Sequence, residues 1–135
     1  MSQFFILIAE DDTVDRYLIM EALQRTNLFD KIVITNNMQD AISYMSKANR
    51  LPDLILSDLI MPKKNGFDLF KETRKDNRFK KIPFFIYSSC FSSSDIKTAQ
   101  RLGIEIWMRK PETLPDYIQM SYKVWDFVRQ KTLSN

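Results

Sequence analysis

Three observations predict an α/β fold with a doubly wound, parallel five-stranded sheet and five helices. Short apolar runs recur along the chain, and segments with apolar residues three or four positions apart separate them. Five strands that alternate with five helices form βαβ units with right-handed crossovers. The length of 135 residues and the hydrophobic content of 44% fit one domain, residues 1–135, with one core.

The five strands are predicted from runs of apolar or β-branched residues. The first run is continuously apolar, as expected of a strand covered on both faces, whereas the last alternates with a charged residue. That last strand is therefore expected to be half covered and to lie at an edge of the sheet. The predicted strands are residues 4–9, 31–35, 54–56, 84–87 and 104–106.

The five helices are predicted from the apolar spacing and from residues that favour helix ends. Asp12 or Thr13 is expected to cap the first helix, and Ser93 or Ser94 the fourth. Gly103 is expected to stop the fourth helix, because glycine readily adopts the left-handed conformation of a helix end. The helices are expected at about residues 13–26, 38–45, 67–76, 94–102 and 114–130.

The composition excludes several classes of function. The net charge of +3 and the isoelectric point near 9.0 give only a mildly basic surface, so a dedicated nucleic-acid binder is not expected. The chain has no histidine, which removes most zinc sites and most general-base chemistry. Cys90 is the single cysteine, and no apolar run approaches the ~20 residues that span a bilayer. A cytoplasmic protein without a membrane segment is therefore expected.

Candidate site residues follow four of the five predicted strands. Glu10 and Asp11 follow the first strand, Asp58 the third, Ser88 the fourth and Lys110 the fifth. Since the carboxyl ends of parallel strands meet at one edge of the sheet, these side chains are expected to converge there. Open α/β sheets bind their ligands at that edge.

Three converging carboxylates repel one another unless a cation offsets their charge. Oxygen ligands without histidine or cysteine favour a hard ion, Mg²⁺ or Mn²⁺. Lys110 would add an ammonium group and Ser88 a hydroxyl. Metal, ammonium and hydroxyl together would hold the three oxygens of a phosphoryl group, with Asp58 as the nucleophile.

Four motifs, in this order, resemble those of response-regulator receiver domains, and the resemblance covers essentially the whole chain. They are Glu10-Asp11, then Ser57-Asp58-Leu59-Ile60-Met61-Pro62 with Gly66 eight residues after Asp58, then Ile86-Tyr87-Ser88-Ser89, and finally Lys110-Pro111. The resemblance implies a flavodoxin-like fold with strand order 2-1-3-4-5. It also implies a stand-alone response regulator of a two-component or phosphorelay system, with no output domain.

The resemblance implies roles for individual residues. Asp58 would accept a phosphoryl group from a histidine kinase or a histidine phosphotransfer protein. Asp11 and Asp58 would bind Mg²⁺ directly, Glu10 through a water molecule, and Ile60 through its backbone carbonyl. Such a domain is not an enzyme in the usual sense, because it catalyses only the gain and loss of its own phosphoryl group.

Four residues would form the switch: Ser88, Trp107, Lys110 and Pro111. Ser88 and Lys110 would contact the phosphoryl group, and the Lys110–Pro111 peptide bond would be cis. Ser88 keeps the hydroxyl of the Thr that the family has more often. Trp107 stands where the family usually has Tyr or Phe. Because the Trp ring is larger, the sequence alone does not decide whether it fits the inward rotamer that the family uses.

The final predicted helix has a wide apolar surface that could bind a partner. Its apolar residues cover an arc of roughly 220°, against about 100° for a helix that packs on a core. One interpretation is a helix packed deeply in the core. The other is a surface, formed with the fourth helix and fifth strand, for an unknown downstream protein or for a homodimer. That surface would depend on whichever of Tyr117, Val124 and Phe127 are exposed.

Other interpretations compete with a phosphorylated receiver. The main alternative is a receiver-like module that binds its partner constitutively and does not switch by phosphorylation. A phosphohydrolase of the haloacid-dehalogenase type needs a second Asp two residues after the nucleophile, where this chain has Ile60, which cannot transfer a proton. A flavin binder is disfavoured because the acidic loop after the first strand would repel a phosphate.

Overall fold

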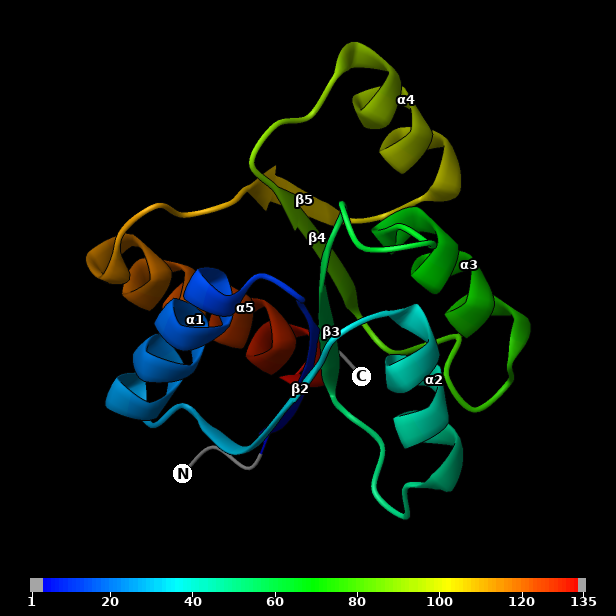
Figure 1. Cartoon of the computed structure of the whole chain (residues 1–135). Helices are drawn as coiled ribbons and strands as arrows, with labels where there is room; N and C mark the ends of the chain where they lie inside the picture. The colour runs from blue at the N-terminus through cyan, green and yellow to red at the C-terminus, as the bar shows by residue number, and fades with distance from the viewer. Residues whose placement is uncertain (1–3, 134–135) are drawn as a thin grey trace.

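The five strands form one parallel sheet in the order β2-β1-β3-β4-β5, which confirms the predicted fold class and topology. A computed structural model describes residues 4–133, and residues 1–3 and 134–135 lie outside the described part. Figure 1 shows the sheet running through the middle of the molecule with helices on both sides. The strands are β1 (Phe4–Ala9), β2 (Phe29–Thr35), β3 (Leu54–Asp58), β4 (Phe84–Ser88) and β5 (Ile106–Arg109).

The helices lie in two layers and are α1 (Thr13–Thr26), α2 (Met38–Lys47), α3 (Gly66–Lys75), α4 (Ser93–Leu102) and α5 (Leu114–Leu133). Helices α1 and α5 cover one face of the sheet, and α2, α3 and α4 cover the other (Figure 1). Strands β1, β3 and β4 are consequently buried on both faces, which accounts for their apolar runs.

The two ends of α4 are determined by residues close to it in sequence. Ser92, rather than Ser93 or Ser94, is the N-cap, because its hydroxyl accepts a hydrogen bond from the backbone N–H three residues on. Gly103 ends the helix as predicted, with a φ of 79° in the left-handed region.

β5 begins at Ile106, two residues later than predicted. The alternation of residues 104–106 resembles a strand, but the Ile104 N–H donates to Ala99 O at 3.1 Å and so completes the end of α4. Pairing with β4 starts only where Ile106 lies opposite Phe85. The expectation of an edge strand with partial cover is confirmed, since β5 is the last strand of the sheet and is half-buried.

Helix α5 packs deeply on the sheet. Tyr117 and Val124 are buried, and the half-buried Phe127 ring lies edge-to-face against Phe85 with ring centroids 5.0 Å apart. None of the three apolar residues named for a partner surface is exposed, so for them the core interpretation is correct. Within residues 4–133, no helix combines the length and apolar character needed to cross a bilayer.

Candidate functional site

Adjacent strand ends bring three carboxylates together, as the sequence predicts. Strands β1 and β3 are neighbours, with Ala9 opposite Ser57, so Glu10 and Asp58 leave the sheet side by side. One carboxylate oxygen from each of Glu10, Asp11 and Asp58 lies within 4.8 Å of the others. Glu10 and Asp58 are buried whereas Asp11 is exposed, so this acidic cluster is open to solvent through Asp11.

The loop after β3 is held against the strand by a close backbone approach at Gly66. The Gly66 N–H donates to Leu59 O at 2.9 Å, and a Cβ atom at this position would lie 2.7 Å from Asp58 O. Only glycine allows this approach. The Ile60 N–H donates to Asp58 Oδ1 at 3.2 Å, and Ser57 Oγ donates to Asp58 O at 2.9 Å. Neighbouring residues therefore hold the Asp58 backbone and one oxygen of its carboxylate, Oδ1.

Lys110 binds three carboxylates at once. Its Nζ lies 2.8 Å from Glu10 Oε1, 2.9 Å from Asp15 Oδ2 and 2.9 Å from Asp58 Oδ2. Its backbone N–H donates to Ser88 O at 2.8 Å, which places it directly beyond the end of β4. Burial alone would lower the pKa of the Lys110 ammonium, but the hydrogen bonds to these three carboxylates raise the pKa above its ordinary value. Lys110 is therefore a permanent cation within the acidic cluster.

Both carboxylate oxygens of Glu10 accept hydrogen bonds. Oε1 accepts from the Tyr87 hydroxyl at 2.6 Å and lies 2.8 Å from Lys110 Nζ, and Oε2 accepts from the Asp12 N–H at 3.0 Å. Burial raises the pKa of Glu10 to about 7, and these hydrogen bonds limit the rise. Burial also raises the pKa of Tyr87, so its hydroxyl stays protonated and donates to the carboxylate. A divalent cation would favour the ionised form of Glu10.

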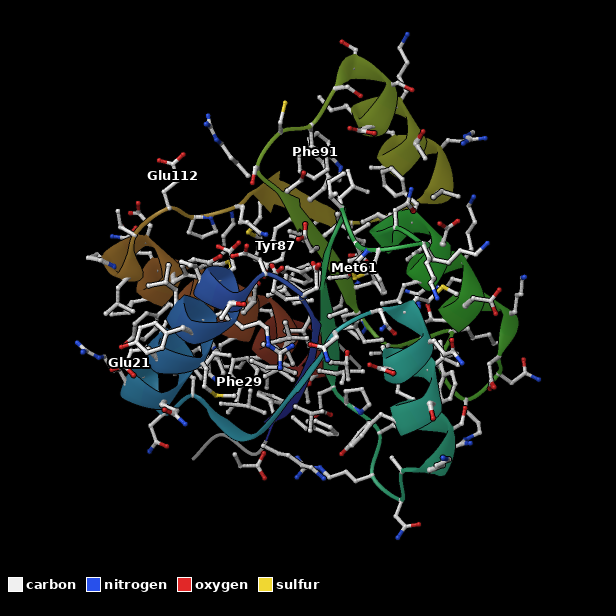
Figure 2. The ribbon with its side chains drawn as sticks, viewed as in Figure 1. Glu21, Phe29, Met61, Tyr87, Phe91 and Glu112 are labelled. Carbon is white, nitrogen blue, oxygen red and sulfur yellow. The ribbon has the colours of Figure 1, made fainter. Side chains whose placement is uncertain are left out.

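Two side chains that were not predicted from the sequence contact the charged groups of the site: Asp15 binds Lys110, and Tyr87 binds Glu10. Tyr117 lies outside the site, one contact beyond Asp15. The Tyr117 hydroxyl donates to Asp15 Oδ1 at 2.8 Å, and Asp15 Oδ2 binds Lys110. Asp15 lies in the first turn of α1, and its position just after the acidic turn was the available signal. In the sequence, Tyr87 belonged to the third receiver motif and Tyr117 to the apolar arc of the final helix, and neither hydroxyl was given a role. Figure 2 shows Tyr87 in the interior of the molecule, where its ring is fully buried.

Two predicted switch residues make their contacts on the β4–α4 loop, residues 89–92, instead of on the acidic cluster. Ser88 Oγ donates to Cys90 O at 2.9 Å and accepts from the Cys90 N–H at 3.3 Å. Trp107 lies half-buried within β5, where its ring packs on Phe91 with centroids 5.8 Å apart and planes at 57°. Figure 2 shows Phe91 on the segment that leads to α4.

The Lys110–Pro111 bond corrects one expectation. The described residues contain no cis peptide bond, so this bond is trans rather than cis. The trans form of an X–Pro bond is favoured by only about 0.5–1 kcal/mol, so the sequence alone does not decide between the two isomers.

The donor set of the acidic cluster fits a hard divalent cation. Its three ligand atoms are all carboxylate oxygens, close enough to reach one ion, and neither histidine nor cysteine contributes. Such donors are those that Mg²⁺ and Mn²⁺ prefer, and the exposed Asp11 leaves room for the water ligands that Mg²⁺ retains.

The family model of the response regulator receiver domain matches residues 6–121, from β1 into α5. The chain belongs to this family. Response regulator Rcp1 of Synechocystis sp. is 24% identical over 127 residues, which cover 90% of this chain and 86% of Rcp1.

Two solved structures of response regulators have the same fold. The phosphorylated cyanobacterial phytochrome response regulator RcpA matches with a TM-score of 0.85 and 27% identity, covering 96% of each chain. The Mn²⁺-bound form of Rcp1 matches with a TM-score of 0.78 and 25% identity, covering 92% of this receiver domain and 93% of Rcp1. The four sequence motifs thus identified the family correctly, and the phosphohydrolase and flavin interpretations are set aside.

Proposed function

We propose that this receiver domain accepts a phosphoryl group on Asp58 with the aid of Mg²⁺ and acts as a stand-alone response regulator. The observation that supports this best is the environment of Asp58. Its buried carboxylate binds Lys110 Nζ at 2.9 Å and lies in reach of Glu10 and Asp11. A nucleophilic carboxylate, a permanent cation and a metal-binding cluster are the parts that phosphoryl transfer needs.

In the transfer step, the P–N bond of a phosphohistidine breaks and a P–O bond forms to a carboxylate oxygen of Asp58. The imidazole leaving group takes up a proton. Asp11 and Asp58 would hold Mg²⁺ directly, Glu10 through water and Ile60 through its backbone carbonyl, and the bound ion would neutralise charge on the phosphoryl oxygens. Hydrolysis of the resulting acyl phosphate restores Asp58. The domain would therefore catalyse only the gain and loss of its own phosphoryl group.

The switch would depend on two hydrogen bonds to the new group. Lys110 would move from the Asp58 carboxylate to a phosphoryl oxygen, and Ser88 would leave its contacts with Cys90 and donate to another. Shifting a two-state equilibrium from 1:99 to 99:1 requires about 5.5 kcal/mol. Hydrogen bonds to charged groups contribute about 1.5–3 kcal/mol each, so two can supply most of that free energy.

The proposed donor is a histidine kinase or a histidine phosphotransfer protein, and the exchange would take place in the cytoplasm. The proposed output surface is the face formed by α4, β5 and α5, for a downstream protein or a homodimer. Only Ala99 of α4 is buried, and β5 is an edge strand. Figure 1 shows α4 next to β5, at the upper end of the view. Within this face, α4 and β5 can therefore move at a low cost in packing, whereas α5 is packed deeply on the sheet.

The test is intact mass after incubation with acetyl phosphate and Mg²⁺. The wild type should gain one phosphoryl group, and Asp58→Asn or a chelator should abolish the gain. Asp116→Asn, an exposed aspartate on α5, is the matched control and should behave as the wild type. A folded wild type that binds Mg²⁺ but gains no mass would contradict the proposal.

The alternative of a constitutive binding module has one observation in its favour, the engagement of Ser88 with its own loop. It is distinguished by partner affinity. A switching receiver treated with beryllofluoride, a phosphoryl mimic, should bind its partner with a changed affinity, and Asp58→Asn should remove that change. A constitutive module would bind its partner with the same affinity as untreated wild type, as treated wild type and as Asp58→Asn.

A further inference from the structure

The Tyr87 hydroxyl has no role in the mechanism proposed above. It lies on a fully buried side chain at the end of β4 and donates to Glu10 Oε1 at 2.6 Å. Strand β3 separates β4 from β1, so the tyrosine reaches past a whole strand to the residue that follows β1. A side chain shorter than tyrosine would not span that separation.

The hydroxyl is the part of Tyr87 that packing does not explain. A phenylalanine would fill the core between the sheet and helices α1 and α5 equally well, since the two rings have the same shape. The hydroxyl adds a buried polar group, which is stabilising only when it is hydrogen-bonded. Its partner is a carboxylate of the acidic cluster, and that contact is the specific property that tyrosine contributes.

The contacts around Glu10 show what the hydroxyl does there. Asp12 binds Oε2, while Lys110 and Tyr87 share Oε1. Lys110 also binds Asp15 and Asp58, and in the proposed function it moves to the phosphoryl group. When Lys110 moves, Tyr87 is the remaining side-chain donor that the structure places on Glu10.

We propose that Tyr87 is a positioning residue of the metal site, which holds the Glu10 carboxylate beside Asp11 and Asp58 so that its charge faces the cation. The inference rests on the proposed function, because Mg²⁺ at the acidic cluster is part of that proposal. Hydrogen-bond partners of metal-binding carboxylates orient them, and loss of such a partner typically weakens metal affinity 10–100-fold.

Tyr117 provides a matched control within the same molecule. It is also fully buried, and its hydroxyl donates to a carboxylate, Asp15 Oδ1, at 2.8 Å. Asp15 binds Lys110 but does not belong to the acidic cluster. Tyr117→Phe therefore removes the same atom from an equally buried tyrosine without removing a contact of a metal-binding carboxylate.

The experiment is calorimetric titration of Mg²⁺ into the metal-free protein near neutral pH, with circular dichroism to establish folding. Tyr87→Phe should weaken Mg²⁺ binding by about tenfold, the low end of the usual range because Glu10 would reach the ion through water, whereas Tyr117→Phe should bind Mg²⁺ as the wild type does. Unchanged affinity in Tyr87→Phe, or equal loss in both variants, would overturn the inference.

A double-mutant cycle tests whether Tyr87 acts through Glu10. If it does, Tyr87→Phe should have no further effect on Mg²⁺ affinity in a Glu10→Gln background, because the carboxylate to be positioned is gone. Additive losses would overturn the inference. A wild type that binds Mg²⁺ but takes no phosphoryl group contradicts the proposed function and leaves the role of Tyr87 standing, whereas a wild type without Mg²⁺ binding overturns both.

Discussion

The two sides of the site are held in different ways. On the side of β1 and β3, Glu10, Asp58 and Lys110 are buried and joined by ion pairs of 2.8–2.9 Å. On the side of β4 and β5, Ser88 binds its own loop and Trp107 packs half-buried on Phe91. The first side is thus held by buried ion pairs, whereas the second is held by hydrogen bonds within one loop and by a half-buried ring contact.

The side of β1 and β3, the acceptor side, carries the groups of the proposed phosphoryl transfer. The side of β4 and β5, the loop side, carries those of the proposed switch. In the proposed function, the buried and hydrogen-bonded acceptor side would need little reorganisation when the donor arrives. The loop side is held by two hydrogen bonds between Ser88 and Cys90 and by one half-buried ring contact, and segments with few buried contacts open at low free energy. The largest effects on stability are therefore expected on the acceptor side, and the smallest on the loop side.

The largest expected effect follows from removing Lys110. Lys110→Met leaves the buried Glu10 and Asp58 carboxylates without their cation, and loss of one partner of a buried ion pair costs about 3–5 kcal/mol. Urea denaturation near neutral pH, without divalent metal, measures the loss. Lys75→Met is the control, because its exposed pair with Glu72 should be worth less than about 1 kcal/mol. Equal losses in the two variants would contradict the contrast between the two sides.

The next effect is a pH dependence from Glu10. Its pKa in the folded protein is about 7, raised from an ordinary value of 4.5 mainly by burial. The folded state therefore binds this proton more tightly than the unfolded state, so the contribution of Glu10 is fully present below pH 4.5 and is lost as the pH rises through 7. That loss amounts to about 3 kcal/mol.

Denaturation of the wild type and of Glu10→Gln in the presence of a chelator, at pH 5 and pH 8, measures this loss of stability. The wild type should lose more stability than Glu10→Gln over this interval. A parallel pH dependence in the two proteins would show that Glu10 does not titrate there.

Substitutions at the two glycines of the chain are expected to have intermediate effects on stability. Gly66→Ala forces a Cβ atom against Asp58 O and should cost about 1–3 kcal/mol, as overpacking does. It should also slow phosphoryl uptake, because Asp58 must shift. Gly103→Ala meets no neighbouring atom but keeps a positive φ, so it should cost about 1 kcal/mol. Denaturation together with the mass assay distinguishes them, since only Gly66→Ala should affect both.

The smallest effect on stability is expected on the loop side. Ser88→Ala removes the hydrogen bonds with Cys90 and should cost about 1 kcal/mol or less. It should nevertheless change the lifetime of the phosphoryl group, which mass measurements over time would record. Ser89→Ala, at the exposed neighbouring position, is the control for both measurements. A stability loss as large as that of Lys110→Met would remove the distinction between the two sides.

The parts of the site that could be predicted from sequence are those that follow a strand directly. Glu10, Asp58 and Lys110 sit where an apolar run ends, and parallel strands bring such ends together. Tyr87 could not be assigned in this way. It lies within the apolar run of β4, and only the three-dimensional placement of its hydroxyl distinguishes it from a core residue.

Local hydrogen bonding explains the other differences. Ile104 looks like the start of a strand, but its N–H serves the end of α4. The Ser88 hydroxyl was expected at the phosphoryl group, whereas in the structure its hydrogen bonds are with the Cys90 backbone two residues away. Tyr117 was assigned to an apolar arc, and its hydroxyl contact with Asp15 on α1 depends on how two helices pack. Sequence patterns record which face a residue is on but not these individual pairings.

The position of Lys110 has a consequence for how folding depends on metal. Many metal-binding domains unfold without their ion, because nothing else neutralises the ligands and the binding free energy is also folding free energy. Here Lys110 Nζ, 2.8 Å from Glu10 and 2.9 Å from Asp58, serves as a built-in counterion. The domain is therefore expected to fold without a divalent cation, and in the proposed function Mg²⁺ would be an exchangeable reagent rather than a structural component.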